Sequence, residues 1–178
     1  MRRLPAGLIA LFVAASTFAT AQSPASPPNP QIDADGFAKD VAAAGALRAA
    51  RRLSEEEFIR MAKEPGTVVL DARSDRLFRM RHVKGAVNLG FPEFTAETLA
   101  RVIPSKATRV LIYCNNNFLS APESMPTKVA RSALNLSTYV SLYAYGYRNV
   151  YELGPALDVR ASKLQFEGEE IGSPPSRG

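Results

Sequence analysis

The sequence has a single cysteine, a single histidine and no tryptophan in 178 residues. One cysteine, Cys114, excludes an internal disulfide. Cys114 and His82 together are too few for a structural zinc site, which needs several ligands at short spacing. We therefore expect no metal and no cofactor. The formal net charge of +5 is modest, and no basic stripe with interleaved aromatic residues is present, so nucleic-acid binding is not expected.

Long apolar runs are also missing. The longest, residues 7–18, is too short and too rich in small residues for a comfortable membrane span. It follows Arg2 and Arg3 and leads to Ala19-Thr20-Ala21, a small-x-small cleavage pattern. We predict a signal peptide over residues 1–21, cut after Ala21, and a periplasmic or secreted protein with no stable membrane anchor after cleavage. The alternative is an uncleaved N-terminal anchor.

Composition divides the rest of the chain into four parts. Residues 22–33 are rich in Pro, Ser, Gln and Asn and are predicted to be a flexible linker. Residues 34–52 are Ala-rich and predict a helical extension that covers part of the main domain with Phe37, Val41 and Leu47. The main domain is predicted over residues 53–160, followed by a C-terminal strand and tail over 161–178.

Helical and strand patterns alternate in the main domain. Ser54 and Glu57 form a capping box that starts a helix ending near Pro65. Short apolar runs typical of buried parallel strands recur at "TVVLDAR", "AVNLGF", "RVLIYC" and "NVYELG". We predict an α/β fold, a doubly wound, mainly parallel sheet of about four to five strands with helices on both faces. Chemistry in such sheets sits at the carboxyl ends of strands, where Cys114 is found.

Three asparagines follow the cysteine. A thiol reacts as the thiolate and needs groups that stabilise negative charge. Asn115, Asn116 and Asn117 tolerate positive φ, so they could wind the backbone around the sulfur and aim main-chain amides at it. The alternative is an inert thiol ending a buried strand, followed by ordinary turn residues. Local sequence alone leaves both open.

The order "VVLDAR", "HVKGAVNL", "VLIYC" and "NVYEL", between Leu53 and Leu157, resembles a rhodanese-like domain. The resemblance implies a doubly wound domain with an active cysteine, here Cys114, after the central strand. It implies a sulfurtransferase that takes a sulfane sulfur from a small anion such as thiosulfate, holds it as a persulfide and passes it to a thiol or cyanide. Asp71, Arg73 and His82 are then expected to support the scaffold rather than to react.

The segment after Cys114 departs from the family. In rhodanese-like domains the active loop after the cysteine is normally very short. Here the first arginine after Cys114 is Arg131, and Pro122 and Pro126 interrupt any helix between them. Lys128 and Arg131 either return to bind an anionic substrate or are ordinary surface charges. The next helix is expected to start at Arg131 or with Asn135 as its cap.

The long loop leaves two hypotheses about function open. Phosphatase activity needs an arginine within the loop and is not supported. The first hypothesis is an exported sulfurtransferase that uses Cys114. The second is a catalytically inactive rhodanese-like module that binds a partner protein, whose identity the sequence does not give, or a small anion.

Overall fold

The computed structural model of the protein describes residues 29–171, so the predicted signal peptide, most of the predicted linker and the end of the tail lie outside the described residues. Residues 33–171 belong to one compact unit. Within the described part, no helix is long and apolar enough to cross a membrane.

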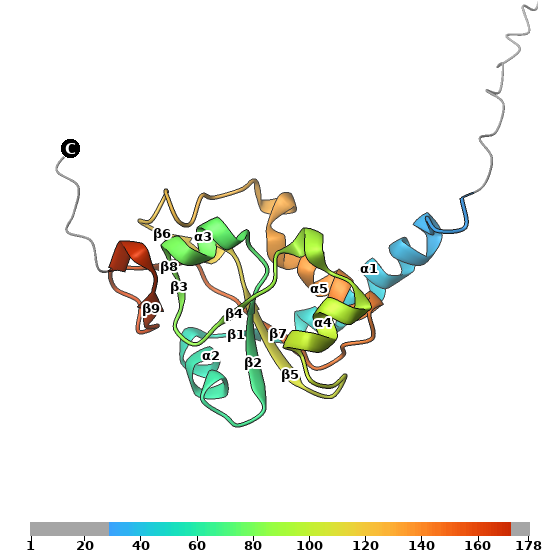
Figure 1. Ribbon diagram of the computed structural model, residues 1–178, viewed down its shortest axis with the longest axis horizontal. Coiled ribbons are helices and arrows are strands. Elements are labelled where there is room, and N and C mark those ends of the chain that lie inside the picture. The colour runs from blue at the N-terminus through green and yellow to red at the C-terminus, as the bar shows by residue number, and fades with distance from the viewer. Residues whose placement is uncertain (1–28, 172–178) are drawn as a thin grey trace, which may run out of the picture. The chain divides into compact units, whose positions relative to one another are not determined.

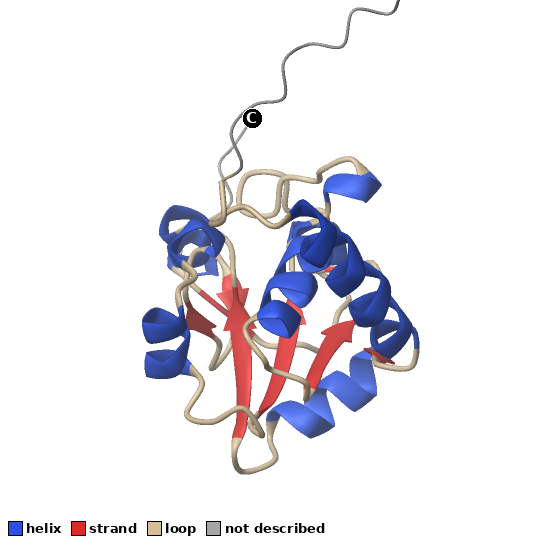
Figure 2. Cartoon of the chain, turned by 90° about the vertical axis from the view of Figure 1, so that its right-hand side faces the viewer, coloured by secondary structure: helices blue, strands red, loops and turns tan. Residues whose placement is uncertain are grey.

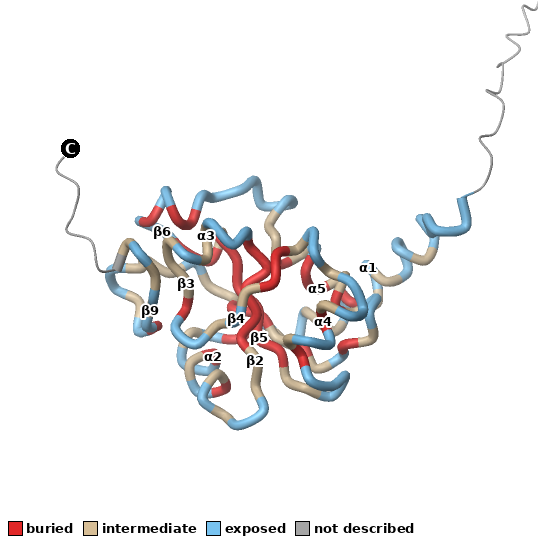
Figure 3. Tube along the Cα trace, viewed as in Figure 1, coloured by how far each residue is buried: buried red, intermediate tan, exposed pale blue. Residues whose placement is uncertain are grey.

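The centre of the fold is a five-stranded sheet in the order β1-β7-β5-β2-β4, and all neighbouring strands are parallel. The strands are β1 (Arg52–Leu53), β2 (Thr67–Asp71), β4 (Val87–Asn88), β5 (Arg109–Tyr113) and β7 (Val150–Leu153). The β5 strand is central and buried along most of its length (Figures 1 and 3).

Helices cover both faces of this sheet (Figures 1 and 2). The α2 helix (Glu55–Ala62) packs on one face, and α1 (Ala34–Ala49), α4 (Ala96–Val102) and α5 (Leu134–Ala144) pack on the other. Side chains of β5 alternate between two cores: Leu111 and Tyr113 join α2, whereas Val110 and Ile112 join α4 and α5. The predicted fold class is confirmed.

Local signals placed several elements correctly. Ser54 and Glu57 form the predicted capping box at the start of α2. The run "AVNLGF" forms only the two-residue β4, and β1 had no clear signal because two residues are too few for a pattern. Outside the main sheet, β9 (Phe166–Glu167) pairs antiparallel with β3 (His82–Val83), next to α3 (Asp75–Met80).

The long segment after Cys114 first crosses to the α2 side of the sheet. After the 3₁₀ turn Asn115–Asn117, β6 (Phe118–Leu119) pairs parallel with β8 (Leu157–Asp158). Phe118, Ala121 and Met125 are buried in the core that contains α2. The chain then returns through exposed residues and the 3₁₀ turn Ala130–Ser132.

The α5 helix begins at Leu134, so neither predicted start is correct: Arg131 lies in the 3₁₀ turn, and Asn135 lies inside the helix rather than at its cap.

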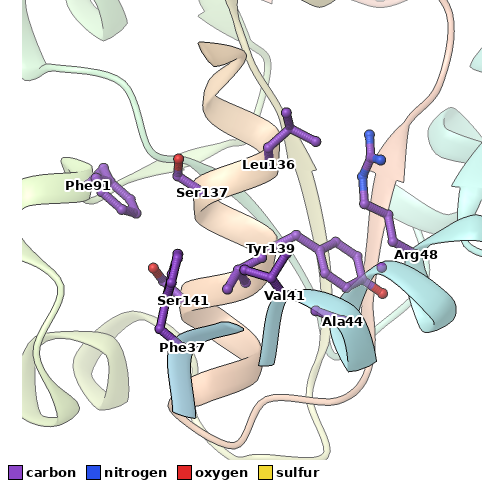
Figure 4. A pocket seen from close by; sticks show the side chains of 11 residues that line it. Phe37, Val41, Ala44, Arg48, Phe91, Leu136, Ser137, Tyr139 and Ser141 are labelled. Atoms are coloured by element: carbon purple, nitrogen blue, oxygen red, sulfur yellow. The ribbon is translucent and has the colours of Figure 1, made fainter. Parts of the chain in front are cut away.

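The α1 helix packs on α5 most closely through Ala44 rather than through the larger residues that the sequence suggested. Ala44 is fully buried, whereas the side chains of Phe37 and Val41 remain 61% and 42% exposed. They line a cavity of about 360 Å³ between the two helices (Figure 4). Phe37 and Val41 lie on the same face of α1 as Ala44, but both stay largely exposed, so they cover the domain less than expected, and Leu47 is half-buried.

Candidate active site

Cys114 directly follows β5, the middle strand of the sheet. It lies two residues beyond Ile112, so its side chain points to the face covered by α4 and α5. The residue is only 2% exposed. The thiol therefore sits under the first turn of α5, at the carboxyl end of the central strand.

Main-chain N–H groups converge on this sulfur. Those of Asn135 and Leu134 come from the first turn of α5, and that of Asn116 comes from the turn after the cysteine. The first N–H groups of a helix have no partner within the helix, which leaves them available to an anion. Burial nevertheless dominates and raises the pKa of the Cys114 thiol, while the three amides act to lower it.

The asparagine triplet does not adopt the backbone expected for it. Asn115–Asn117 form a 3₁₀ turn, and Ser120 is the one non-glycine residue with positive φ among residues 29–171. The expectation of left-handed asparagines is therefore wrong. A tight right-handed turn places the amide of Asn116 at the sulfur without any positive φ.

The side chains of the triplet hold the loop together. Asn117 Oδ1 accepts a hydrogen bond from the main-chain N–H of Cys114 at 2.9 Å and another from the side-chain Nδ2 of Asn135 at 3.1 Å. Asn117 Nδ2 donates to the carbonyls of Leu153 and Pro155. Asn117 thus connects the cysteine, the helix above it and the neighbouring strand.

The other two asparagines differ from each other. Asn116 bonds the main chain of Lys128 through both ends of its amide, at 2.7 and 3.1 Å. Asn115 is buried, and its side-chain oxygen has no hydrogen-bond partner. The Asn116 and Asn117 side chains are thus bonded to protein groups, whereas the Asn115 side-chain oxygen is left without a partner.

Asp71 and Arg73 pair on the opposite face of the sheet from the sulfur. Arg73 is buried and lies 2.5 Å from Asp71, and it also donates to the carbonyls of Ser124 and Arg81. The hydroxyl of Tyr113 donates to Asp71 at 2.6 Å, and burial raises the pKa of Tyr113 well above its ordinary value. The pair therefore fixes the long loop at Ser124.

His82 also lies away from the sulfur chemistry. Its ring stacks on Phe78 with centroids 3.7 Å apart, and Nδ1 donates to the Phe78 carbonyl at 2.8 Å. These contacts fix the turn between α3 and β3.

Lys128 and Arg131 are exposed, and in the described part of the chain neither side chain has an ion pair or hydrogen bond. Asn116 holds the main chain of Lys128 beside the cysteine loop. The two charges are therefore free to meet an anion, but the contacts do not place either of them on the sulfur.

Sequence reasoning missed Glu152 of β7. This carboxylate is 1% exposed and pairs with Arg48 of α1 at 2.7 Å and with Arg52 of β1 at 3.2 Å. The available signal was a lone acidic residue inside the apolar run "NVYELG", because a buried charge requires a partner. Among residues 29–171, no group of three or more His, Cys, Asp and Glu side chains could hold a metal ion.

The residue pattern of the Rhodanese-like domain family matches residues 54–153, which contain Cys114, Asp71, Arg73 and His82. The chain belongs to the rhodanese-like domain family. The match starts at the cap of α2 and ends with β7, so it contains the central strands β2, β5 and β7 and leaves α1 outside.

The chain is similar to several solved structures. The BH2092 protein from Bacillus halodurans is 16% identical with a TM-score of 0.50, over 75% of this chain and 88% of that one. A rhodanese-like domain of the Alr3790 protein from Anabaena is 18% identical with a TM-score of 0.48, over 72% and 86%.

Thiosulfate sulfurtransferase from Pseudomonas aeruginosa is also 18% identical with a TM-score of 0.48, over 74% of this chain and 23% of its own. No curated protein matches the chain. At 16% identity the likeness to the BH2092 protein shows the fold alone, so the argument for activity has to come from the site.

Proposed function

We propose that the protein is an exported sulfurtransferase in which Cys114 carries a sulfane sulfur as a persulfide. The observation that carries the proposal is the convergence of three main-chain N–H groups on a cysteine at the end of the central strand. Groups placed in this way stabilise negative charge on sulfur, both in the free thiolate and in the anionic persulfide.

The reaction has two half-reactions, and in each one an S–S bond breaks as a new bond to the transferred sulfur forms. The Cys114 thiolate attacks the outer sulfur of thiosulfate, the thiosulfate S–S bond breaks, and sulfite leaves with the bonding electron pair. Cyanide or a thiolate then attacks the outer sulfur of the persulfide. That attack forms thiocyanate or a new persulfide and returns Cys114 as the thiolate.

Access to the sulfur requires movement, because Cys114 is almost fully buried. The exposed segment 126–132 is held to the cysteine loop by the two bonds between Asn116 and Lys128, and those are bonds that can open in water. A thiol covered in this way is also protected from oxidation in an oxidising compartment, which suits the export predicted from residues 1–21.

The second candidate is an inactive rhodanese-like module that binds a partner protein or a small anion. The observation that favours it is the combination of a 2% exposed cysteine with a thiol pKa raised by burial. The two candidates differ in whether sulfur passes through Cys114.

A steady-state assay separates them. The mature protein, given thiosulfate and cyanide, is expected to produce thiocyanate with ping-pong kinetics, because the two half-reactions share the persulfide. The rate is expected to rise with pH in the neutral to alkaline range, since the raised thiol pKa leaves little thiolate at neutral pH. Cys114→Ser is the matched control, and thiocyanate formation equal to that of this control would favour the inactive module.

Lys128 and Arg131 are proposed to attract the anionic substrate. We expect the double variant Lys128→Ala/Arg131→Ala to raise the KM for thiosulfate roughly two- to fivefold at low salt, with little change in kcat. The difference should shrink as salt is added, because exposed charges are screened. Lys63→Ala, an exposed charge at the end of α2, is the control. An equal KM for the double variant and the control would remove the two residues from substrate recognition.

A further inference from the structure

Glu152 places a carboxylate on the strand next to the cysteine. The register of β7 against β5 pairs Glu152 with Ile112, and Cys114 follows two residues beyond Ile112. Side chains at these positions point to the same face of the sheet. Burial is the main cause of the raised pKa of Cys114, and the negative charge of Glu152, which disfavours a nearby thiolate, adds a smaller effect in the same direction.

Two arginines compensate this carboxylate. Arg48 Nε lies 2.9 Å from Glu152 Oε2, and a terminal nitrogen of the same guanidinium lies 2.7 Å from Oε1. Arg52 Nε approaches Oε1 at 3.2 Å from β1. The Arg48 contact is the two-pronged geometry in which an arginine holds a carboxylate most firmly.

Both arginines precede the part of the chain that matches the family, which begins at residue 54. Arg48 reaches Glu152 because of how α1 sits on α5. Fully buried Ala44 brings the helices close, and Arg48 follows one helical turn later on the same side (Figure 4). The α1 helix, which lies outside the family match, thus contacts β7, the strand next to the one that leads to Cys114.

We propose that α1 is a functional part of the active site, in which Arg48, assisted by Arg52, compensates the buried Glu152 carboxylate and so favours the anionic form of the Cys114 sulfur. The proposal rests on the function assigned above to Cys114. Arg48 is a positioning residue in this scheme, since it acts on the sulfur through Glu152.

Other ionisable groups near the pair are few. Tyr139 of α5 is buried, its pKa is raised mainly by burial, and its hydroxyl donates to the Val150 carbonyl. Arg51 acts on Tyr139 from the end of α1. Lys128 and Arg131 belong to the exposed segment, and the Asp71–Arg73 pair lies on the other face of the sheet. Glu152 is thus the acidic group that acts on Cys114, and its compensation comes from Arg48 and Arg52.

The test measures the ionisation of Cys114 directly, by ultraviolet thiolate absorbance against pH, with Cys114→Ser subtracted to remove the tyrosine signal. A single cysteine makes the signal unambiguous. We expect Arg48→Gln to lower the thiolate fraction at a given pH roughly three- to tenfold, and Glu152→Gln to raise it. Arg48→Lys, which keeps the charge, should stay close to the wild type.

The double variant Arg48→Gln/Glu152→Gln should behave as Glu152→Gln alone. Once the Glu152 charge is gone, Arg48 has nothing to compensate, so its replacement should have no further effect on the titration. Arg101→Gln, from the exposed pair with Glu97, is the control and should leave the titration unchanged. If Arg48→Gln leaves the thiolate titration unchanged, or if the two single variants shift it in the same direction, the proposal is overturned. The titration involves no sulfur transfer, so its result is separate from that of the activity assay.

Discussion

Replacing Arg73 with methionine is expected to lower the free energy of unfolding by about 3–5 kcal/mol. The change removes the cation and leaves the carboxylate of Asp71 buried, with the Tyr113 hydroxyl and the main-chain N–H of residue 73 as its remaining donors. It also removes the bonds to the carbonyls of Ser124 and Arg81, so the long loop loses an anchor. Denaturant unfolding, followed by circular dichroism, measures the loss.

A matched control exists on the surface of the same protein. Arg79 and Asp75 form the same kind of pair on α3, but their side chains are 60% and 64% exposed, against 1% and 0% for Arg73 and Asp71. Arg79→Met should therefore cost no more than about 1 kcal/mol. Should Arg73→Met fail to fold, the double variant Asp71→Asn/Arg73→Met should recover folding, because no buried charge is left unpaired. Equal costs for Arg73→Met and Arg79→Met would contradict this account of the loop.

The second large effect is expected at Asn117. Asn117→Ala removes Oδ1, which accepts hydrogen bonds from the Cys114 N–H and the Asn135 side chain. It also removes Nδ2, which donates to the Leu153 and Pro155 carbonyls. Because these bonds set the position of the cysteine relative to the first turn of α5, we expect kcat for sulfur transfer to fall about 100-fold. The free energy of unfolding should fall by about 1–3 kcal/mol, since buried polar groups lose their partners.

Asn149→Ala is the control for this change. Asn149 also bonds a carbonyl, that of Ala107, but at an exposed site away from β5's carboxyl end. Its kcat should stay at the wild-type value when both proteins are assayed well below their unfolding temperatures. An Asn117→Ala variant that is folded and as active as Asn149→Ala would show that the tethering of the loop has no part in catalysis.

How much of this could be read from sequence depended on how local each signal was. The Ser54 cap and the buried runs around Val69 and Leu111 are local, so the helix and strands they predict are present. Cys114 was found because it follows a buried strand, whereas Asp71 and Arg73 were found through the resemblance to the rhodanese-like family.

The remaining features depend on pairings between distant residues. Glu152 is paired by Arg48, 104 positions away, and no local pattern announces such a contact. The path of the long loop is set by Phe118 and Met125 entering the core with α2, which no periodicity within the loop reveals. The burial of Ala44 rather than Phe37 likewise depends on the shape of α5, which the sequence of α1 does not contain.

The central claim is that the Cys114 sulfur accepts and holds a second sulfur atom. Intact-protein mass spectrometry after thiosulfate treatment tests it most directly, with the modified residue assigned by peptide fragmentation. The account predicts a gain of one sulfur atom at Cys114, its loss on addition of cyanide, and no gain in Cys114→Ser. A wild-type protein that keeps its unmodified mass under the same conditions, while folded, would contradict the account.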